Sequence, residues 1–180
     1  MSSQAIRLRL LAVLALALLA VEAQAACTDV GAPGVGWRRC LLDGMDLTAA
    51  DLSGGDLRDA SFKRSDLDGA NLSRIQGRRA KFVSASLVKA DLSGADLVQA
   101  DLTSADLSDA KLVGANLRAA RLFQANLRGV DLTDAVLDGA DFLHADFSGA
   151  RWTDGQTICA EGSLGRCHPG SAAAGAKVQG

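Results

Sequence analysis

Large apolar residues recur at every fifth position over most of this chain, a period that suits neither a helix nor a straight strand. In the stretch ADLSGADLVQADLTSADL, residues 90–107, leucine occupies positions 92, 97, 102 and 107. An α-helix advances about 100° per residue, so successive leucines would lie roughly 140° apart around its axis. A strand alternates its side chains with a period of two, so an odd step sends successive leucines to opposite faces. The backbone must therefore turn within every unit.

The five-residue register continues without a net insertion from Val35 to Asp154, which is 120 residues or 24 units. A small residue, usually alanine, stands two positions before each central apolar residue, and Asp or Asn usually lies between them. In extended backbone the small and central residues point the same way, and the residue between them points oppositely. Equal turns after each unit close a square in four units. We therefore expect 20-residue coils that stack at a spacing of about 4.8 Å.

These units resemble the A(D/N)LXX repeats of the pentapeptide-repeat protein family, and the resemblance covers residues 35–154. The flanking segments PGVGWRRC and WTDGQTICAEGSLGRC are similar to those of secreted bacterial members. The resemblance implies an all-β solenoid, a right-handed quadrilateral β-helix. Its repeats would form about six 20-residue coils.

Two further patterns favour the 20-residue coil. Opposite charges alternate at intervals of 20 residues, in the series Asp91, Lys111, Asp131, Arg151 and in the series Lys81, Asp101, Arg121, Asp141. Opposite charges on neighbouring rungs stabilise a sheet.

The second pattern is an exchange of side-chain volume between neighbouring positions. Gly77 replaces a central leucine, and in the same unit Ile75 replaces the small residue. Gly55, 20 residues before Ile75, is smaller than the usual alanine. We expect Ile75 to fill the vacated space and preserve close packing. A bulged binding loop is the alternative interpretation of this segment.

The first 25 residues have the features of a secretory signal peptide. Arg7 and Arg9 precede an apolar run over residues 10–21, and the small-residue site Ala23-Gln24-Ala25 follows it. A run of 12 residues is shorter than the roughly 20 that a membrane-spanning helix needs. We expect export to the periplasm or beyond and a mature chain that is not an integral membrane protein. A lipid-modified Cys27 is a lesser alternative, since small residues precede it but Gln24 stands where such sites usually have leucine.

The four cysteines flank the repeats and predict two disulfides in an exported chain. Because the stacked coils separate the two ends, only the local pairs Cys27 with Cys40 and Cys159 with Cys167 satisfy the short distance that a disulfide requires. The expected organisation adds an N-terminal cap at 26–34, a C-terminal cap at 155–168 and a disordered tail at 169–180. A zinc site of Cys159, Cys167 and His168 is the alternative, but its three ligands have a spacing unlike that of common structural sites.

The sequence predicts no catalytic site, cofactor site or metal site. His144 is expected on an outward corner and His168 borders the tail, and the serines have no recurring base beside them.

The outward residues give the sides of the rod different charges. In the units centred on Leu47 to Trp152, one wall carries six acids and two bases, and an adjacent wall carries four bases and two acids. The second wall also aligns Val83, Thr103, Phe123 and Leu143 at intervals of 20, with His144 at its edge. Val83, Phe123, Leu143 and His144 form a candidate partner-binding stripe, and ordinary inter-strand packing is the alternative explanation.

The function that these observations favour is a non-catalytic exported scaffold or protein-interaction module with an unknown protein partner. The family resemblance implies one alternative, a DNA mimic that binds DNA gyrase, a type II topoisomerase. Export would remove the protein from that cytosolic target. The repeats are also only mildly acidic, with 17 acids and 13 bases from Met45 to Asp154. No nucleic-acid partner is expected.

Overall fold

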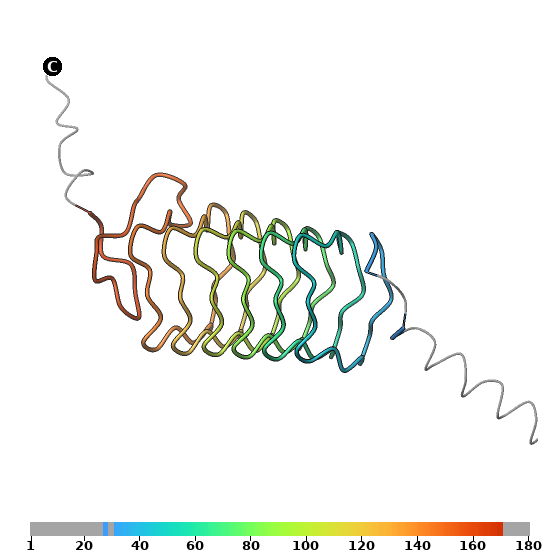
Figure 1. Ribbon diagram of the computed structural model, residues 1–180. Coiled ribbons are helices and arrows are strands. Elements are labelled where there is room, and N and C mark those ends of the chain that lie inside the picture. The colour runs from blue at the N-terminus through green and yellow to red at the C-terminus, as the bar shows by residue number, and fades with distance from the viewer. Residues whose placement is uncertain (1–26, 29–30, 171–180) are drawn as a thin grey trace, which may run out of the picture.

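The computed structural model describes residues 27–28 and 31–170, and the expected signal peptide lies outside them. The repeats form a rod of stacked, four-sided turns (Figure 1). Isolated parallel bridges join residues 20 apart along its whole length, from Gly36 with Asp56 to Asp131 with Arg151. The 20-residue period expected from the sequence is therefore confirmed. Each turn uses four consecutive five-residue units, one for each side.

The four sides are named here by their central residues. Face 1 contains Trp37, Leu57, Gly77, Leu97, Leu117 and Leu137. Face 2 contains Leu42, Phe62, Phe82, Leu102, Leu122 and Phe142. Face 3 contains Leu47, Leu67, Leu87, Leu107, Leu127 and Phe147. Face 4 contains Leu52, Leu72, Leu92, Leu112, Leu132 and Trp152.

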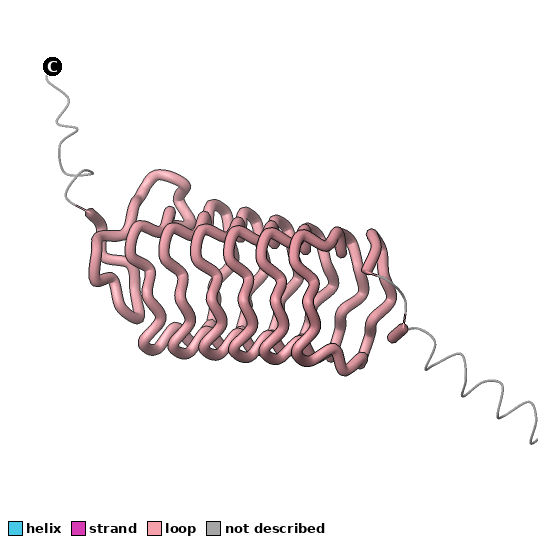
Figure 2. The backbone as a smooth tube through the Cα atoms, viewed as in Figure 1, coloured by secondary structure: helices cyan, strands magenta, loops and turns pink. Residues whose placement is uncertain are grey.

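Each face is only one bridge residue wide, so the rod has neither helices nor extended strands among residues 27–28 and 31–170 (Figure 2). The expected all-β architecture is present in the parallel bridges between coils, but these bridges are isolated and form no extended strands. Three residues of each unit run straight, and the two that follow form a turn. In one example, Cys40 N–H donates to Trp37 C=O at 3.0 Å and closes the turn. Because a turn follows every three residues, each unit forms only one bridge to the neighbouring coil.

The lumen is filled by the central and small residues, as their spacing predicts. Central leucines such as Leu92, Leu102 and Leu112 are fully buried, and so are most of the alanines beside them. Aromatic side chains gather at the two ends of this core. Phe62 stacks on Phe82 with ring centroids 5.2 Å apart near the N-terminal end, and Phe147 contacts Trp152 at 5.4 Å near the C-terminal end. Large rings therefore fill the lumen toward both ends of the rod.

The volume exchange at Ile75 is present inside this core. Ile75 is buried, and a Cβ atom added at Gly77 would lie 3.3 Å from its Cδ1 and 3.0 Å from Leu97 Cδ2. Ile75 thus occupies the space that a central side chain at 77 would need. The space beside Gly55 is limited instead by Val35, whose carbonyl oxygen would lie 3.1 Å from an added Cβ. The five-residue register continues through this coil, so it is repacked and not looped out.

The aspartates and asparagines of the repeat satisfy a backbone donor that the coil itself leaves free. Ser93 N–H donates to Asp91 Oδ1 at 2.9 Å, and Ser73 N–H donates to Asn71 Oδ1 at 3.1 Å. Where serine replaces the acid, an aspartate of the preceding coil takes over, since Asp68 Oδ1 accepts Val88 N–H at 3.0 Å. A side-chain oxygen that accepts a nearby backbone N–H stabilises a turn. Asp or Asn therefore recurs for turn formation, and not as part of a catalytic or metal site.

Every corner of the rod places one residue at positive φ. The series runs at five-residue intervals from Gly34 to Gly149, and glycine fills only some of its positions. Ala119, for example, has φ +53°. L-residues other than glycine pay about 1–2 kcal/mol for the left-handed region. Each corner with a residue other than glycine therefore costs conformational free energy, and burial of the apolar side chains in the lumen offsets this cost.

This cost predicts that Ala119→Gly stabilises the protein. Relief of the strained backbone outweighs the extra entropy that glycine gives the unfolded chain, and we expect a net gain of about 0.5–1 kcal/mol. The matched control is Gly114→Ala, because Gly114 has φ +65° with open space around it, and this change should destabilise. Urea denaturation of both variants measures the effect. A stabilised Gly114→Ala would contradict this account of the corners.

The ends of the rod are closed by short caps tied by disulfides. Cys27 is bonded to Cys40 and Cys159 to Cys167, so both expected pairings are confirmed. Zinc ligation by Cys159 and Cys167 is accordingly ruled out in this structure. After Asp154 the chain leaves the stack and crosses its C-terminal end, where Arg151 pairs with Ile158 and Cys159 with Pro169 in antiparallel bridges (Figure 1). Backbone bonding extends to Gly170, whose N–H donates to Ile158 C=O at 2.9 Å. The remainder of the expected tail lies outside the described residues.

Candidate interaction surface

Because the coil repeats every 20 residues, outward side chains that are 20 positions apart lie in straight columns along the rod. On face 2, the bridge residues Lys81, Asp101, Arg121 and Asp141 lie on successive rungs. Arg121 approaches Asp101 to 3.6 Å, so one pair of the alternating charges on this face is in contact. On face 4, Arg151 lies 3.8 Å from Asp131 in the same way. These exposed pairs each contribute little to stability, and their main consequence is a fixed charge pattern on each face.

The candidate stripe lies in the next column of face 2. Val83, Thr103 and Phe123 are partly buried, whereas Leu143 is 56 % exposed. The ring of His144 meets that of Phe123 edge to face, with centroids 5.8 Å apart. Thr103 donates its hydroxyl hydrogen to Asp101 at 2.6 Å. The column is therefore continuous, but its exposed apolar surface is concentrated at the C-terminal end of the rod.

A shallow groove of about 420 Å³ lies at the corner between faces 1 and 2. It is lined by Arg79, Lys81, Gln99, Asp101, Ala119 and Arg121. Arg79 is already paired with Asp59 at 2.7 Å, and this guanidinium lowers the pKa of the Asp59 carboxyl. Lys81 has no ion pair within the described residues. The groove thus offers at least one uncompensated cation beside the apolar column.

Basic side chains extend from this groove over the N-terminal half of faces 1 and 2. Arg38, Arg58 and Arg78 follow one another at 20-residue intervals on face 1. Arg58 binds Asp56 at 2.6 Å and lowers the pKa of that carboxyl, and Arg78 binds Asp96 at 2.6 Å. Within the described part of the chain, five bases on these faces have no ion pair. They are Arg38, Arg39, Lys63, Arg64 and Lys81.

The two remaining faces have the opposite balance. From Val35 to Asp154, faces 3 and 4 carry eleven acids and five bases, whereas faces 1 and 2 carry seven acids and ten bases. Some carboxylates on faces 3 and 4 accept only backbone N–H groups or hydroxyls, as Asp46 does from Thr48. The rod is therefore basic on one pair of adjacent faces and acidic on the other. The acidic face 3 was predicted from the sequence, whereas the arginine column of face 1, which begins before Leu47, was not.

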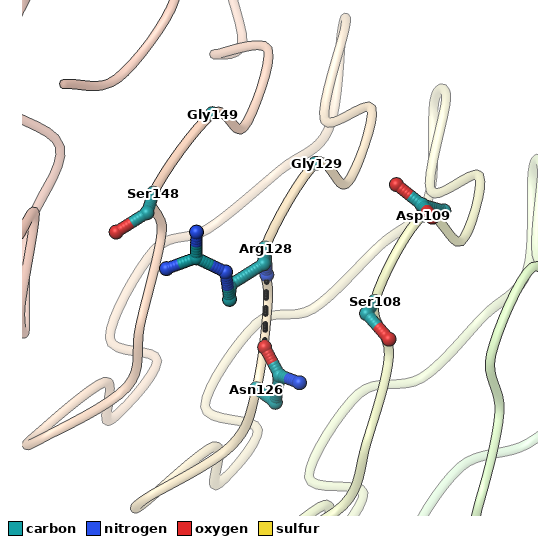
Figure 3. A pocket seen from close by; sticks show the side chains of 7 residues that line it. All are labelled: Ser108, Asp109, Asn126, Arg128, Gly129, Ser148 and Gly149. Carbon is teal, nitrogen blue, oxygen red and sulfur yellow. Dashed lines mark hydrogen bonds between the residues drawn. The ribbon is translucent and has the colours of Figure 1, made fainter. Parts of the chain in front are cut away.

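A second groove, of about 470 Å³, lies on face 3 near the C-terminal cap (Figure 3). Its only full cation is Arg128, which binds Asp146 at 3.1 Å and Glu161 at 3.0 Å. These two carboxylates raise the pKa of Arg128. Ser148 bonds both Asp146 and Gly162 N–H. Because Arg128 and Ser148 already bind groups of the rod and of the cap, these two side chains fasten the cap to the rod and offer little to a ligand.

Neither groove contains the elements of a catalytic or metal centre. No cluster of three or more His, Cys, Asp or Glu side chains in the described ranges has a metal-binding arrangement. The same ranges contain no helix that is long and apolar enough to cross a membrane. What the geometry does present is a rigid outer wall with segregated charge and one apolar column.

A family model described as Pentapeptide repeats matches residues 40–76, 80–118 and 115–151. Among solved structures, the chain is similar to a pentapeptide repeat protein from the thylakoid lumen of Arabidopsis thaliana. The two are 26 % identical over 73 % of this chain and 86 % of that one, with a TM-score of 0.43. It is also similar to Rfr23 from the cyanobacterium Cyanothece 51142, with 29 % identity over 58 % and 82 % of the two chains and a TM-score of 0.31.

HetL of Nostoc, described as involved in heterocyst differentiation regulation, is 35 % identical over 65 % of this chain and 62 % of its own, with a TM-score of 0.28. No curated protein sequence matches this chain.

Proposed function

We propose that this chain, which belongs to the pentapeptide repeat family, is a non-catalytic interaction module that binds an acidic protein partner through faces 1 and 2. Its rod of about six right-handed coils holds the side chains of those faces at fixed spacing. The observation that supports the proposal is the coincidence of two features on face 2. Uncompensated bases, Lys81 among them, lie at the N-terminal end of a partly apolar column that ends three coils later in the exposed Leu143. Apolar contact supplies affinity, and complementary charge supplies orientation and association rate.

The partner is proposed to lie outside the cytoplasm. Both disulfides connect cysteines at the rod ends, and such bonds persist mainly in oxidising compartments. The expected signal peptide over residues 1–25 agrees with this location. We therefore place the protein in the periplasm or outside the cell, where it would act as a scaffold for an envelope or extracellular protein.

The proposal predicts that Phe123→Ser with Leu143→Ser weakens capture of the partner by at least tenfold, since each buried apolar side chain contributes about 1.5–3 kcal/mol. The measurement is capture from periplasmic extract, quantified by mass spectrometry, with circular dichroism to verify folding. Val113→Ser is the matched control, because Val113 has the same slot on face 4. Lys81→Glu should also weaken capture, while Lys111→Glu, at the equivalent slot of face 4, should not. Equal capture by all four variants would contradict the docking surface.

The second candidate function, gyrase binding by DNA mimicry, is favoured by one observation. Face 3 carries six acids against two bases from Leu47 to Trp152 with Asp46 included. A DNA mimic needs such a wall to replace the phosphates. The interaction module predicts no inhibition in a gyrase supercoiling assay. Potent inhibition, abolished by substitutions on face 3 but not on face 2, would favour the DNA mimic instead.

A further inference from the structure

The N-terminal end of face 2, in the blue part of Figure 1, carries the most exposed large apolar side chain of the described residues. Leu41 is 83 % exposed, and Met45, beyond the next corner, is 44 % exposed. Leu41 occupies the outward bridge position of the first coil. The later bridge positions of face 2 all carry polar residues, namely Ser61, Lys81, Asp101, Arg121 and Asp141. Leu41 is thus the one apolar member of its column, and it projects from the rod.

Four bases lie at the corners on either side of Leu41. Arg38 and Arg39 form the corner that precedes it, and Lys63 and Arg64 form the corner that follows face 2 on the next coil. None of the four forms an ion pair within the described residues. The N-terminal rim, as named here, comprises Arg38, Arg39, Leu41, Met45, Lys63 and Arg64.

Few acids offset the charge of this rim. Asp43 is the one acid in the first coil of faces 1 and 2, residues 35–44. Its Oδ1 accepts the Ser61 hydroxyl at 2.6 Å and the Lys63 N–H at 3.0 Å. On the second coil, both acids of face 1 form ion pairs with arginines outside the rim. Asp43 can offset only one of the four rim bases, so the rim is positively charged.

The charge of faces 1 and 2 also changes sign along the rod. In their first three coils, residues 35–44, 55–64 and 75–84, these faces carry eight bases and three acids. In their last three coils, residues 95–104, 115–124 and 135–144, they carry two bases and four acids. An anionic surface therefore attracts the N-terminal half of these faces and repels the C-terminal half.

We propose that the N-terminal rim docks on an anionic lipid surface, with Leu41 and Met45 in the lipid interface and the four rim bases beside lipid phosphates. Such binding increases with buried apolar area and with attraction to anionic headgroups. A leucine that projects from a rigid end needs a matching pocket in a protein, whereas fluid lipids adapt to it. Asp46 and Asp51, on the first coil of faces 3 and 4, are repelled. The rod therefore meets the surface with its face 1 and face 2 side.

The expected route of export also favours lipid as the occupant. The expected signal peptide ends at Ala25, two residues before Cys27, and the disulfide joins Cys27 to Cys40, the residue before Leu41. A signal peptide lies in the membrane until it is cleaved, so the rim would be the part of the rod nearest to lipid. The exposed Leu143 lies at the other end of face 2. Docking at the rim is thus independent of the protein partner proposed above.

Co-sedimentation of the protein, purified after export, with lipid vesicles tests the proposal. Vesicles of phosphatidylglycerol and phosphatidylcholine should bind the protein at least tenfold more tightly than vesicles of phosphatidylcholine alone, and added salt should weaken this binding. Lys63→Ser with Arg64→Ser should weaken it about 20-fold, since each base contributes about fivefold. Lys89→Ser with Lys111→Ser is the matched control. It removes the same charge from faces 3 and 4 and should leave vesicle binding unchanged.

The apolar contribution is tested at Leu41. Leu41→Ser should weaken vesicle binding about tenfold or more. Leu164→Ser is the matched control, because Leu164 is an exposed leucine of the C-terminal cap. Tryptophan favours the lipid–water interface. The fluorescence of Leu41→Trp should therefore shift to the blue with anionic vesicles, while that of Leu164→Trp should not. Circular dichroism verifies that each variant folds.

Three results would overturn the proposal. The first is equal binding to the two kinds of vesicle, or no binding to either. The second is a dimer in analytical ultracentrifugation that Leu41→Ser dissociates without changing vesicle binding, which would identify a second copy as the occupant. The third is loss of protein capture from membrane-free periplasmic extract by Leu41→Ser with unchanged vesicle binding, which would assign the rim to a protein. The vesicle assay contains no protein partner, so its failure leaves the predicted effects of Phe123→Ser and Leu143→Ser untouched.

Discussion

Ile75→Ala is expected to destabilise the protein by about 2–5 kcal/mol, the usual range for truncating a buried aliphatic side chain to alanine. Ile75 is buried beside Gly77, so the central position of its own unit has no side chain that could fill the cavity that the change leaves. Gly77→Leu alone should also destabilise, by about 1–3 kcal/mol or more, because the added side chain meets Ile75 and Leu97. Chemical denaturation with circular dichroism detection measures both.

The combined variant Ile75→Ala with Gly77→Leu restores the usual arrangement of a small residue followed by a central leucine. We expect it to be more stable than either single variant, since the leucine at 77 fills the volume that the alanine at 75 vacates. The double-mutant cycle should therefore give a coupling of about 1–3 kcal/mol. Additive losses would show that Ile75 and Gly77 are independent, which would contradict the exchange of volume across this coil.

The second large effect is expected at the caps. Replacing both Cys159 and Cys167 with serine should cost about 2–3 kcal/mol, because the disulfide restricts the unfolded chain. The same bond holds the segment that supplies Ser163 and Thr157 to the last coil. Loss of this cap should expose further strand edge and promote end-to-end association.

Thermal unfolding with and without dithiothreitol measures the loss at the caps, and light scattering detects association. The double replacement of Cys27 and Cys40 is the comparison at the other end, where Cys40 itself is buried in the core. A melting temperature that is insensitive to reduction, with free thiols verified by titration, would contradict a stabilising role for these bonds.

The features that the sequence could predict are those that depend on side-chain volume at a fixed period. The leucine at every fifth position predicts a turn in each unit. The exchanged sizes of Ile75 and Gly77 predict that both residues face the same interior. The pairing of Cys159 with Cys167 followed from the distance between the rod ends. Each of these inferences compares residue sizes or separations, which are read directly from the chain.

The features that the sequence did not reveal depend on backbone conformation and on the hydrogen bonds of single groups. The recurring aspartates were assigned to the outer wall, but their function as acceptors for turn amides, as at Asp91, appeared only with the structure. Positive φ at Ala119 is not signalled by alanine, which avoids that region. The incomplete burial of Leu137 and Phe142 in the last coil was also not foreseen, because the path of residues 155–170 has no repeat pattern.

The arginines of face 1 were missed for a different reason. Their 20-residue spacing is visible in the sequence at Arg38, Arg58 and Arg78, but from Leu47 onward face 1 carries as many acids as bases. The basic balance of faces 1 and 2 becomes pronounced only with Arg38 and Arg39 of the first coil. In the candidate stripe, the ring of His144 contacts that of Phe123, and the binding role of the stripe remains a prediction.

Site-specific photo-cross-linking in cells tests the central claim, that faces 1 and 2 bind the partner. A photoreactive phenylalanine analogue is placed at Val98 on face 1, Phe123 on face 2, Val88 on face 3 and Val113 on face 4, all in the same outward slot. We predict one shared cross-linked product from positions 98 and 123 that disappears at high salt or with Lys81→Glu, and none from positions 88 and 113. Cross-linking of that product from all four faces, or from faces 3 and 4 alone, would contradict the claim.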